Sequence, residues 1–172
     1  MKEIEVKILE IDKTKIESKL KKLGAKKIFS GKLTSYFFDT TTNSLKAKNI
    51  QLRLRESKND CLLTIKKRIS QKETKNSDEF EINVSDFKET KKILELLGFK
   101  LKHKLEKNRV SYVLKDVRFE LDKPKEKVPC FLEIEANDKK TLEKYVKLLG
   151  YKMSQTSNST YRGVLRHYGV LR

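Results

Sequence analysis

Seven segments of this chain alternate between ionised and apolar side chains, and this feature restricts the possible folds more than any other. The first reads EIEVKI over residues 3–8, so an extended strand places its ionised residues on one face and its apolar residues on the other. The alternation recurs in IQLRLRE, LLTIKKR, EFEINV, KNRVSYVL, VRFELD and FLEIEA. Each strand therefore has one face for a hydrophobic core and one face that needs water or ionic partners.

Three further segments have the apolar spacing of amphipathic helices. They read DKTKIESKLKKLG, SDFKETKKILELLG and NDKKTLEKYVKLLG, and each ends at a glycine that suits a left-handed C-cap: Gly24, Gly98 and Gly150. The expected N-caps are Asp12 or Thr14, Ser85 or Asp86, and Asn137 or Asp138. With SYFFDT as a further strand, the pattern predicts about eight strands and three main helices without a domain boundary. The segments ISQKETKNSD and DKPKEKVP are predicted to be loops.

The helices can cover the apolar faces of such a sheet, which gives an α+β fold. The charged faces then meet water if the sheet is open, or line the interior if it closes into a barrel. Three strands carry glutamates and three others carry arginine or lysine. Grouped charges of one sign repel each other unless a counter-ion lies among them, which favours an interior with an acidic, metal-binding side and a basic, polyanion-binding side. A solvated face and an open basic sheet remain as alternatives.

The composition points to anionic partners and a reducing environment. Lys and Arg number 41 against 24 Asp and Glu, a formal charge of +17 that attracts nucleic acid, acidic membranes or phosphorylated small molecules. The two cysteines, Cys61 and Cys130, form no CxxC pair and are interpreted as packed thiols. The charged N-terminus does not resemble a signal peptide, and no apolar run approaches the roughly 20 residues of a membrane helix. We therefore expect a cytoplasmic protein.

The N-terminal motif Glu3-x-Glu5-x-Lys7 resembles the ExExK signature of the CYTH, or triphosphate tunnel metalloenzyme, superfamily. Six further charged elements follow in the family's order: RLR (Arg53, Arg55), TIK (Lys66), EFE (Glu79, Glu81), KNR (Lys107, Arg109), ELD (Asp122) and EIE (Glu133, Glu135). The resemblance covers nearly the whole chain. It implies a single CYTH domain over residues 1–172, with a closed eight-stranded antiparallel barrel, helices packed outside, and a metal-dependent triphosphate site inside.

The resemblance also implies roles for these side chains. The predicted triphosphate-binding residues are Arg53, Arg55, Lys66, Lys107 and Arg109, whose cationic groups suit phosphate oxygens. The predicted ligands of Mg²⁺ or Mn²⁺ are the oxygen donors Glu3, Glu5, Asp122, Glu133 and Glu135. Lys7 is expected to act with Glu3 and Glu5 in catalysis, beside the scissile phosphate, and Glu79 and Glu81 to hold a basic residue or join a metal site. Phosphoryl transfer needs no histidine nucleophile, so His103 and His167 are predicted to be surface residues.

Three features depart from the family pattern. Ser77 stands where many members have an arginine, so one phosphate contact is expected to be missing. The C-terminal Ser-Tyr pattern of relatives appears only loosely, as STYRGVL. The chain has no tryptophan, which disfavours a thiamine triphosphate substrate.

These observations leave three candidate functions. The first is hydrolysis of tripolyphosphate, ATP or another nucleoside triphosphate by metal-activated water. The second is a class IV adenylyl cyclase, in which the ribose 3′-hydroxyl of ATP attacks the α-phosphate and releases pyrophosphate. The third is a non-catalytic module that binds polyphosphate or RNA, motivated by the +17 charge. We favour hydrolysis, because cyclisation needs nucleoside positioning in addition; nucleic acid and membranes are not expected partners, and a homodimer is compatible with the sequence.

Overall fold

The computed structural model describes residues 2–58, 60–70 and 75–171, without the side chains of residues 2, 3, 69, 70, 75 and 76. The strands are β1 Lys2–Ile8, β2 Lys26–Asp39, β3 Ile50–Glu56, β4 Cys61–Ser70, β5 Lys75–Asn83, β6 Lys100–Leu114, β7 Val117–Pro124 and β8 Phe131–Ala136. The helices are α1 Lys13–Lys22, α2 Ser44–Ala47, α3 Phe87–Leu96, α4 Lys139–Leu148 and α5 Tyr161–His167, with a 3₁₀ turn, η1, at Met153–Gln155.

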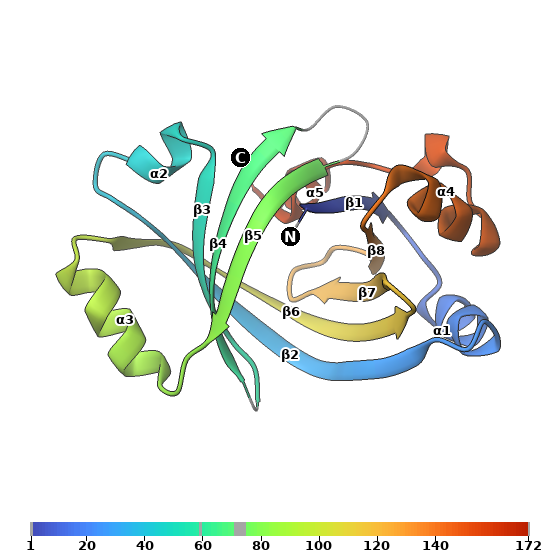
Figure 1. Ribbon diagram of the computed structural model, residues 1–172, viewed down its shortest axis with the longest axis horizontal. Coiled ribbons are helices and arrows are strands. Elements are labelled where there is room, and N and C mark those ends of the chain that lie inside the picture. Colours follow the sequence, from blue (N-terminus) through green and yellow to red (C-terminus); the bar gives the residue numbers. More distant parts are fainter. Residues whose placement is uncertain (1, 59, 71–74, 172) are drawn as a thin grey trace.

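The eight strands form a closed antiparallel barrel in the order β1-β5-β4-β3-β2-β6-β7-β8, which confirms the predicted fold class (Figure 1). The ring closes where β1 pairs with β5, from Lys2 opposite Asp78 to Glu5 opposite Lys75. Strands β2 and β6 form the longest ladder, from Lys26 opposite Val113 to Asp39 opposite Lys100. They extend beyond the SYFFDT and KNRVSYVL segments from which they were predicted.

The three predicted helices begin and end where the sequence indicated. Asp12, Asp86 and Asp138 are the N-caps, and each carboxylate accepts a backbone hydrogen bond three residues later. The glycines at the other ends adopt the left-handed backbone conformation, with φ of 83° at Gly24 and 87° at Gly150. No helix in the described part of the chain is long and apolar enough to cross a membrane.

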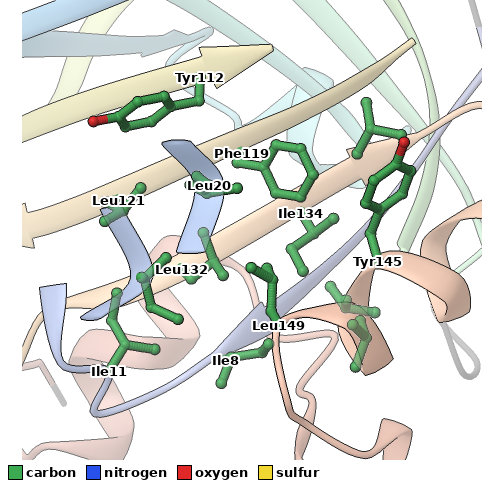
Figure 2. Packing of buried hydrophobic residues seen from close by; sticks show 14 of the residues in the cluster. Ile8, Ile11, Leu20, Tyr112, Phe119, Leu121, Leu132, Ile134, Tyr145 and Leu149 are labelled. Carbon is green, nitrogen blue, oxygen red and sulfur yellow. The ribbon is translucent and has the colours of Figure 1, made fainter. Parts of the chain in front are cut away.

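Helices α1 and α4 cover the outer faces of β1, β6, β7 and β8 (Figure 1). Figure 2 shows this core, in which Leu20 of α1 and Leu149 after α4 pack among Phe119, Leu132 and Ile134 of the sheet. These five side chains are fully buried, and each contributes roughly 1.5–3 kcal/mol to stability. A smaller core places Leu94 of α3 against the outer faces of β2 and β3, where Phe38, Leu52 and Leu54 are buried.

Helix α5 lies at one end of the barrel rather than on its outside. Its Val164 and Leu165 are buried against Phe131 of β8 and Leu105 of β6. Phe131 is paired with Asp122 and Leu105 with Ser35, which places both on the inner face of the sheet. The expectation that the predicted helices pack outside therefore holds for α1, α3 and α4, whereas α5, which was not predicted as a helix, lies at the end of the barrel.

The predicted loop ISQKETKNSD is largely strand in the structure. Ile69 and Ser70 belong to β4 and residues 75–78 to β5, because this polar stretch pairs across the β4–β5 ladder from Arg68 opposite Ser77. Residues 71–74 lie outside the described part. The second predicted loop is correct from residue 125 onward, after Pro124 ends β7.

Candidate functional site

The inner face of the barrel separates into an acidic side and a basic side. The carboxylate-bearing strands β7, β8, β1 and β5 are consecutive in the ring. The strands β4, β3, β2 and β6 complete it, and β4, β3 and β6 carry the predicted cationic residues. Register shows that the predicted residues share this face: Glu5 lies opposite Glu135, Lys7 opposite Glu133, and Arg109 opposite Asp122. The barrel therefore brings together charged groups that are distant in the sequence.

Lys7 is buried on the acidic side, with 2% of its surface exposed. Its Nζ donates hydrogen bonds of 3.0 Å to both Glu5 and Glu133. Burial alone would lower the pKa of Lys7, but the two carboxylates outweigh this effect and raise it. Lys7 therefore remains an ammonium group.

Arg109 connects the two sides through β7. Its Nε and Nη2 each donate to Asp122 at 2.6 Å, and it also contacts Glu120 and, at 3.5 Å, Glu133. Asp122 is fully buried, and Lys107 donates a further 2.6 Å bond to it. Burial alone would raise the pKa of Asp122, but Arg109 and Lys107 hold it below its usual value.

On the basic side, cations meet the glutamates of β5. Lys66 donates to Glu79 at 2.6 Å and to Glu5 at 3.5 Å, so it joins β4 to both β5 and β1. Burial alone would lower the pKa of Lys66, but Glu5 and Glu79 outweigh this effect and raise it. These contacts connect the basic side to the predicted metal ligand Glu5.

Arg53 and Arg55 share a single carboxylate, Glu81. Its Oε2 accepts bonds from Nη2 of Arg53 at 3.4 Å and Arg55 at 3.3 Å, and Thr64 donates to the same oxygen at 2.8 Å. Arg53 has a second contact at 3.3 Å with Glu79, but its buried Nε has no hydrogen-bond partner among the described residues. Glu79 and Glu81 were expected either to hold a basic residue or to join a metal site. In the structure both contact basic residues.

Two cations of this face are poorly compensated. Burial, followed by the charges of Arg53 and Arg109, lowers the pKa of Arg55 to about 10. Burial and Arg109 lower the pKa of Lys107 to about 8, despite its contact with Asp122. An anion placed between these groups would relieve both penalties.

Most of the predicted site residues therefore lie on one face and contact each other. For Glu3 the structure describes only the backbone, which pairs with buried Ser77. Glu135 forms an ion pair with Arg118 at 3.9 Å. The predicted site omitted Glu120 and Thr64. Glu120 lies two residues before Asp122, and Thr64 lies two residues before Lys66, and both of these neighbours were included.

The carboxylates fit a hard divalent ion only in part. Among the described residues, no three His, Cys, Asp or Glu side chains are grouped so as to hold a metal ion. Asp122 is occupied by Arg109 and Lys107, which makes it a poor ligand in this arrangement. Glu5 and Glu135 are direct partners on neighbouring strands, and Mg²⁺ commonly binds through one or two carboxylates together with substrate phosphates. The donor set suits that mode of binding.

The prediction that both histidines lie at the surface is wrong for His103. Phe37 is paired with Arg53 and His103 with Phe37, so all three share the inner face. The rings of Phe37 and His103 stack with centroids 4.5 Å apart and an interplanar angle of 12°. His103 was missed because histidine has no role in the phosphoryl-transfer scheme and its strand neighbours were unknown. His167 is exposed, as expected.

Because of His103, the free energy of unfolding should depend on pH. Burial, followed by Arg162, lowers its pKa to about 4, whereas an unfolded histidine titrates near about 6.5. Between these values the unfolded state binds more protons, so stability is lost as the pH falls. We expect the advantage of wild type over His103→Phe to shrink by about 1–3 kcal/mol from pH 7 to pH 4 in urea unfolding. A difference that is constant with pH would contradict this assignment.

Comparison with known proteins identifies a family and a relative of this chain. The family model described as CYTH domain matches residues 1–161. A Methanocaldococcus jannaschii protein that carries the provisional name adenylate cyclase is 30% identical over 155 residues, which cover 87% of this chain and 88% of that protein.

Two solved structures share the fold over nearly their full length. A Pyrococcus horikoshii protein is 26% identical with a TM-score of 0.77, and the match covers 92% of this chain and 96% of that one. A Vibrio parahaemolyticus protein, described provisionally as an adenylate cyclase, has a TM-score of 0.84 at 16% identity, with coverage of 95% and 97%. At 16% identity the likeness shows the fold alone.

Proposed function

Because the chain belongs to the CYTH domain family, we propose that it is a metal-dependent triphosphatase that hydrolyses tripolyphosphate or a nucleoside triphosphate inside the barrel. The observation that carries the proposal is the incomplete compensation of the positive charges of Arg53 and Arg55. Two guanidinium groups share Glu81, the buried Nε of Arg53 has no partner among the described residues, and the pKa of Arg55 is lowered to about 10. A polyphosphate supplies the negative charge and the acceptor oxygens that this arrangement lacks.

The basic side would hold the phosphate chain. Arg53 and Arg55 present forked donors from β3, with Lys66 on the adjacent strand β4 and Lys107 and Arg109 on β6. Arg109 is already saturated by Asp122 and its neighbours, so it would act mainly as a fixed positive charge. Arg55 and Lys107 are better placed to exchange their present contacts for phosphate oxygens, because their charged forms are the least stabilised.

The acidic side would hold the divalent ion. Glu5 and Glu135, supported by Glu133, are the described oxygen donors for Mg²⁺ or Mn²⁺, and Glu3 is the further ligand that the motif implies. The bound ion would neutralise phosphate charge as a Lewis acid. Lys7, fixed between Glu5 and Glu133, would hold a positive charge beside the scissile phosphate.

Hydrolysis then proceeds by displacement at the terminal phosphorus. A water oxygen forms the new bond, and the bridging P–O bond breaks. Tripolyphosphate yields orthophosphate and pyrophosphate, and ATP yields orthophosphate and ADP. The contribution of the protein is positioning and charge neutralisation, which is the usual requirement for phosphoryl transfer.

Cyclisation of ATP is the second candidate, because the 30% identical relative carries the provisional name adenylate cyclase. In that reaction the ribose 3′-hydroxyl attacks the α-phosphate, and pyrophosphate leaves. The same cations and carboxylates would serve, with the nucleoside end of the substrate held so that its hydroxyl reaches the α-phosphorus.

One incubation series separates these functions. The purified protein is incubated with tripolyphosphate or ATP, with Mg²⁺, Mn²⁺ or EDTA, and orthophosphate, pyrophosphate and cyclic AMP are measured. We expect orthophosphate from both substrates, no cyclic AMP, and loss of turnover in EDTA. Cyclic AMP with equimolar pyrophosphate would identify a cyclase. No product with any metal, together with salt-dependent binding of polyphosphate or RNA that survives EDTA, would identify a non-catalytic module.

A further inference from the structure

The stacked pair of Phe37 and His103 is the part of the inner face that the triphosphate scheme does not use. The inner face is otherwise rich in ionised side chains, yet these two rings lie side by side, both partly exposed. Neither ring belongs to any of the three hydrophobic clusters formed by the described residues. The pair is therefore not explained by packing of the core.

The pair lies at one mouth of the barrel, next to the phosphate-binding arginines. Phe37 is two residues from the end of β2, and His103 is three residues from the start of β6. Arg53 is the direct cross-strand partner of Phe37, and side chains in that relation have Cβ atoms about 4.5–5.5 Å apart. A ligand whose phosphates contact Arg53 would bring an attached group onto the aromatic pair.

Both rings present uncharged aromatic surface at neutral pH. The pKa of His103, lowered to about 4 by burial and by Arg162, keeps the imidazole neutral, and its Nε2 has no hydrogen-bond partner among the described residues. Flat neutral rings beside cations suit a ligand with an aromatic group at one end and phosphates at the other. Inorganic tripolyphosphate has no such group, whereas a nucleoside triphosphate does.

We propose that Phe37 and His103 form a stacking platform for the base of a nucleoside triphosphate whose phosphates reach Arg53 and Arg55. The inference rests on the proposed triphosphate site and names its substrate class. Stacking tolerates different bases, because every base has a π-face, so the platform would favour nucleotides over inorganic polyphosphate without selecting strongly among bases.

The test is calorimetric binding of ATP and of tripolyphosphate to the full chain in Ca²⁺, followed by kcat/KM for both in Mg²⁺ or Mn²⁺. Phe37→Leu and His103→Leu should each weaken ATP binding by about tenfold, the effect expected for loss of stacking on one base. Binding of tripolyphosphate should change less than about twofold, because it does not reach the platform. His103→Phe keeps an aromatic ring and should retain the preference for ATP.

Two matched controls come from the same region of sequence. Phe87 packs against Tyr36 with ring centroids 4.7 Å apart and ring planes tilted by 53°. Tyr36 belongs to the outer face of β2, so Phe87→Leu should leave the ratio of the two affinities unchanged. Phe29, opposite Ser111, lies on the inner face near the other end of β2. If Phe29→Leu and not Phe37→Leu weakens ATP selectively, the platform has been assigned to the wrong mouth and the proposal fails.

The remaining outcomes distinguish this inference from the proposed function. Equal losses for ATP and tripolyphosphate in Phe37→Leu would overturn the platform and leave the triphosphate site intact. Selective loss of ATP binding without turnover by wild type would support the platform and overturn the triphosphatase. Wild type that binds neither ligand would overturn both.

Discussion

Replacing Glu5 by glutamine is expected to reduce metal-dependent turnover of tripolyphosphate by at least about 100-fold while the protein remains folded. Glutamine keeps the shape of the side chain and an acceptor oxygen for Lys7. Lys7 also retains Glu133 at 3.0 Å, and Lys66 retains Glu79 at 2.6 Å. The bonds from Lys7 and Lys66 to Glu5 are weakened, and the loss of free energy of unfolding should stay at about 1.5–3 kcal/mol, the value for a hydrogen bond to a charged group.

Activity is lost because the carboxylate charge is needed on the acidic side, where Glu5 lies directly opposite Glu135. The measurement is kcat at saturating Mn²⁺, together with the Mn²⁺ concentration that gives half-maximal activity. Glu106→Gln is a matched control, since Glu106 also pairs with lysines, Lys32 and Lys104, but belongs to the opposite face of β6 from Lys107. A Glu5→Gln enzyme with more than a tenth of wild-type activity would show that this carboxylate does not bind the metal.

The alternation of side chains allowed much of this inner face to be predicted from the sequence. Strand periodicity is a local property, so the parity of Glu3, Glu5 and Lys7 follows without knowledge of the fold. The helix caps at Asp12, Asp86 and Asp138 are equally local, because each carboxylate accepts a bond from a backbone amide only three residues away.

Contacts between strands could not be predicted in the same way. Lys66 meets Glu79 because β4 is beside β5, and Glu5 meets Glu135 because β1 is beside β8, and neither order is encoded in any short segment. The position of Phe37 was hidden for a related reason. SYFFDT is apolar on both faces, so its alternation does not indicate which aromatic side chain points inward.

The C-terminal helix shows a different limit of sequence analysis. Tyr161–His167 is too short to show an apolar period, and its partners, Leu105 and Phe131, lie on the inner face that the sequence predicted to be charged. Their burial by α5 reconciles two apolar side chains with that interior. The Nζ of Lys107 lies 5.1 Å from the centroid of the Tyr161 ring, so α5 also contributes to the surroundings of a predicted phosphate-binding residue.

The sequence assigned the same phosphate-binding role to Arg109 and Arg55. Their replacement is nevertheless expected to change the stability of the fold differently. Replacing Arg109 by methionine removes the fork that holds fully buried Asp122 and the contact with Glu120. Breaking a buried ion pair by removing one partner costs about 3–5 kcal/mol. Asp122 keeps only the bond from Lys107 at 2.6 Å, so its buried charge is then only partly compensated. For a chain of this length that cost corresponds to a decrease in Tm of roughly 10 °C or more.

Arg55→Met is the matched variant, with the same chemical change at an equally inward position. Arg55 has one carboxylate contact, at 3.3 Å, and burial together with Arg53 and Arg109 disfavours its charge. Removing it relieves repulsion between cations, so its Tm should equal or exceed that of wild type while turnover of tripolyphosphate falls by about 100-fold. Calorimetric scans of the two variants at pH 7 give the comparison.

The contrast follows from what each arginine contacts on the inner face. Arg109 is compensated by carboxylates of the protein itself, so its charge stabilises the fold; Arg55 is not, so its charge is available to a substrate anion. Equal decreases in Tm for the two variants would contradict this division. Tripolyphosphate should raise the Tm of wild type more than that of Arg55→Met, since a ligand that binds more tightly stabilises the folded state more at the same concentration.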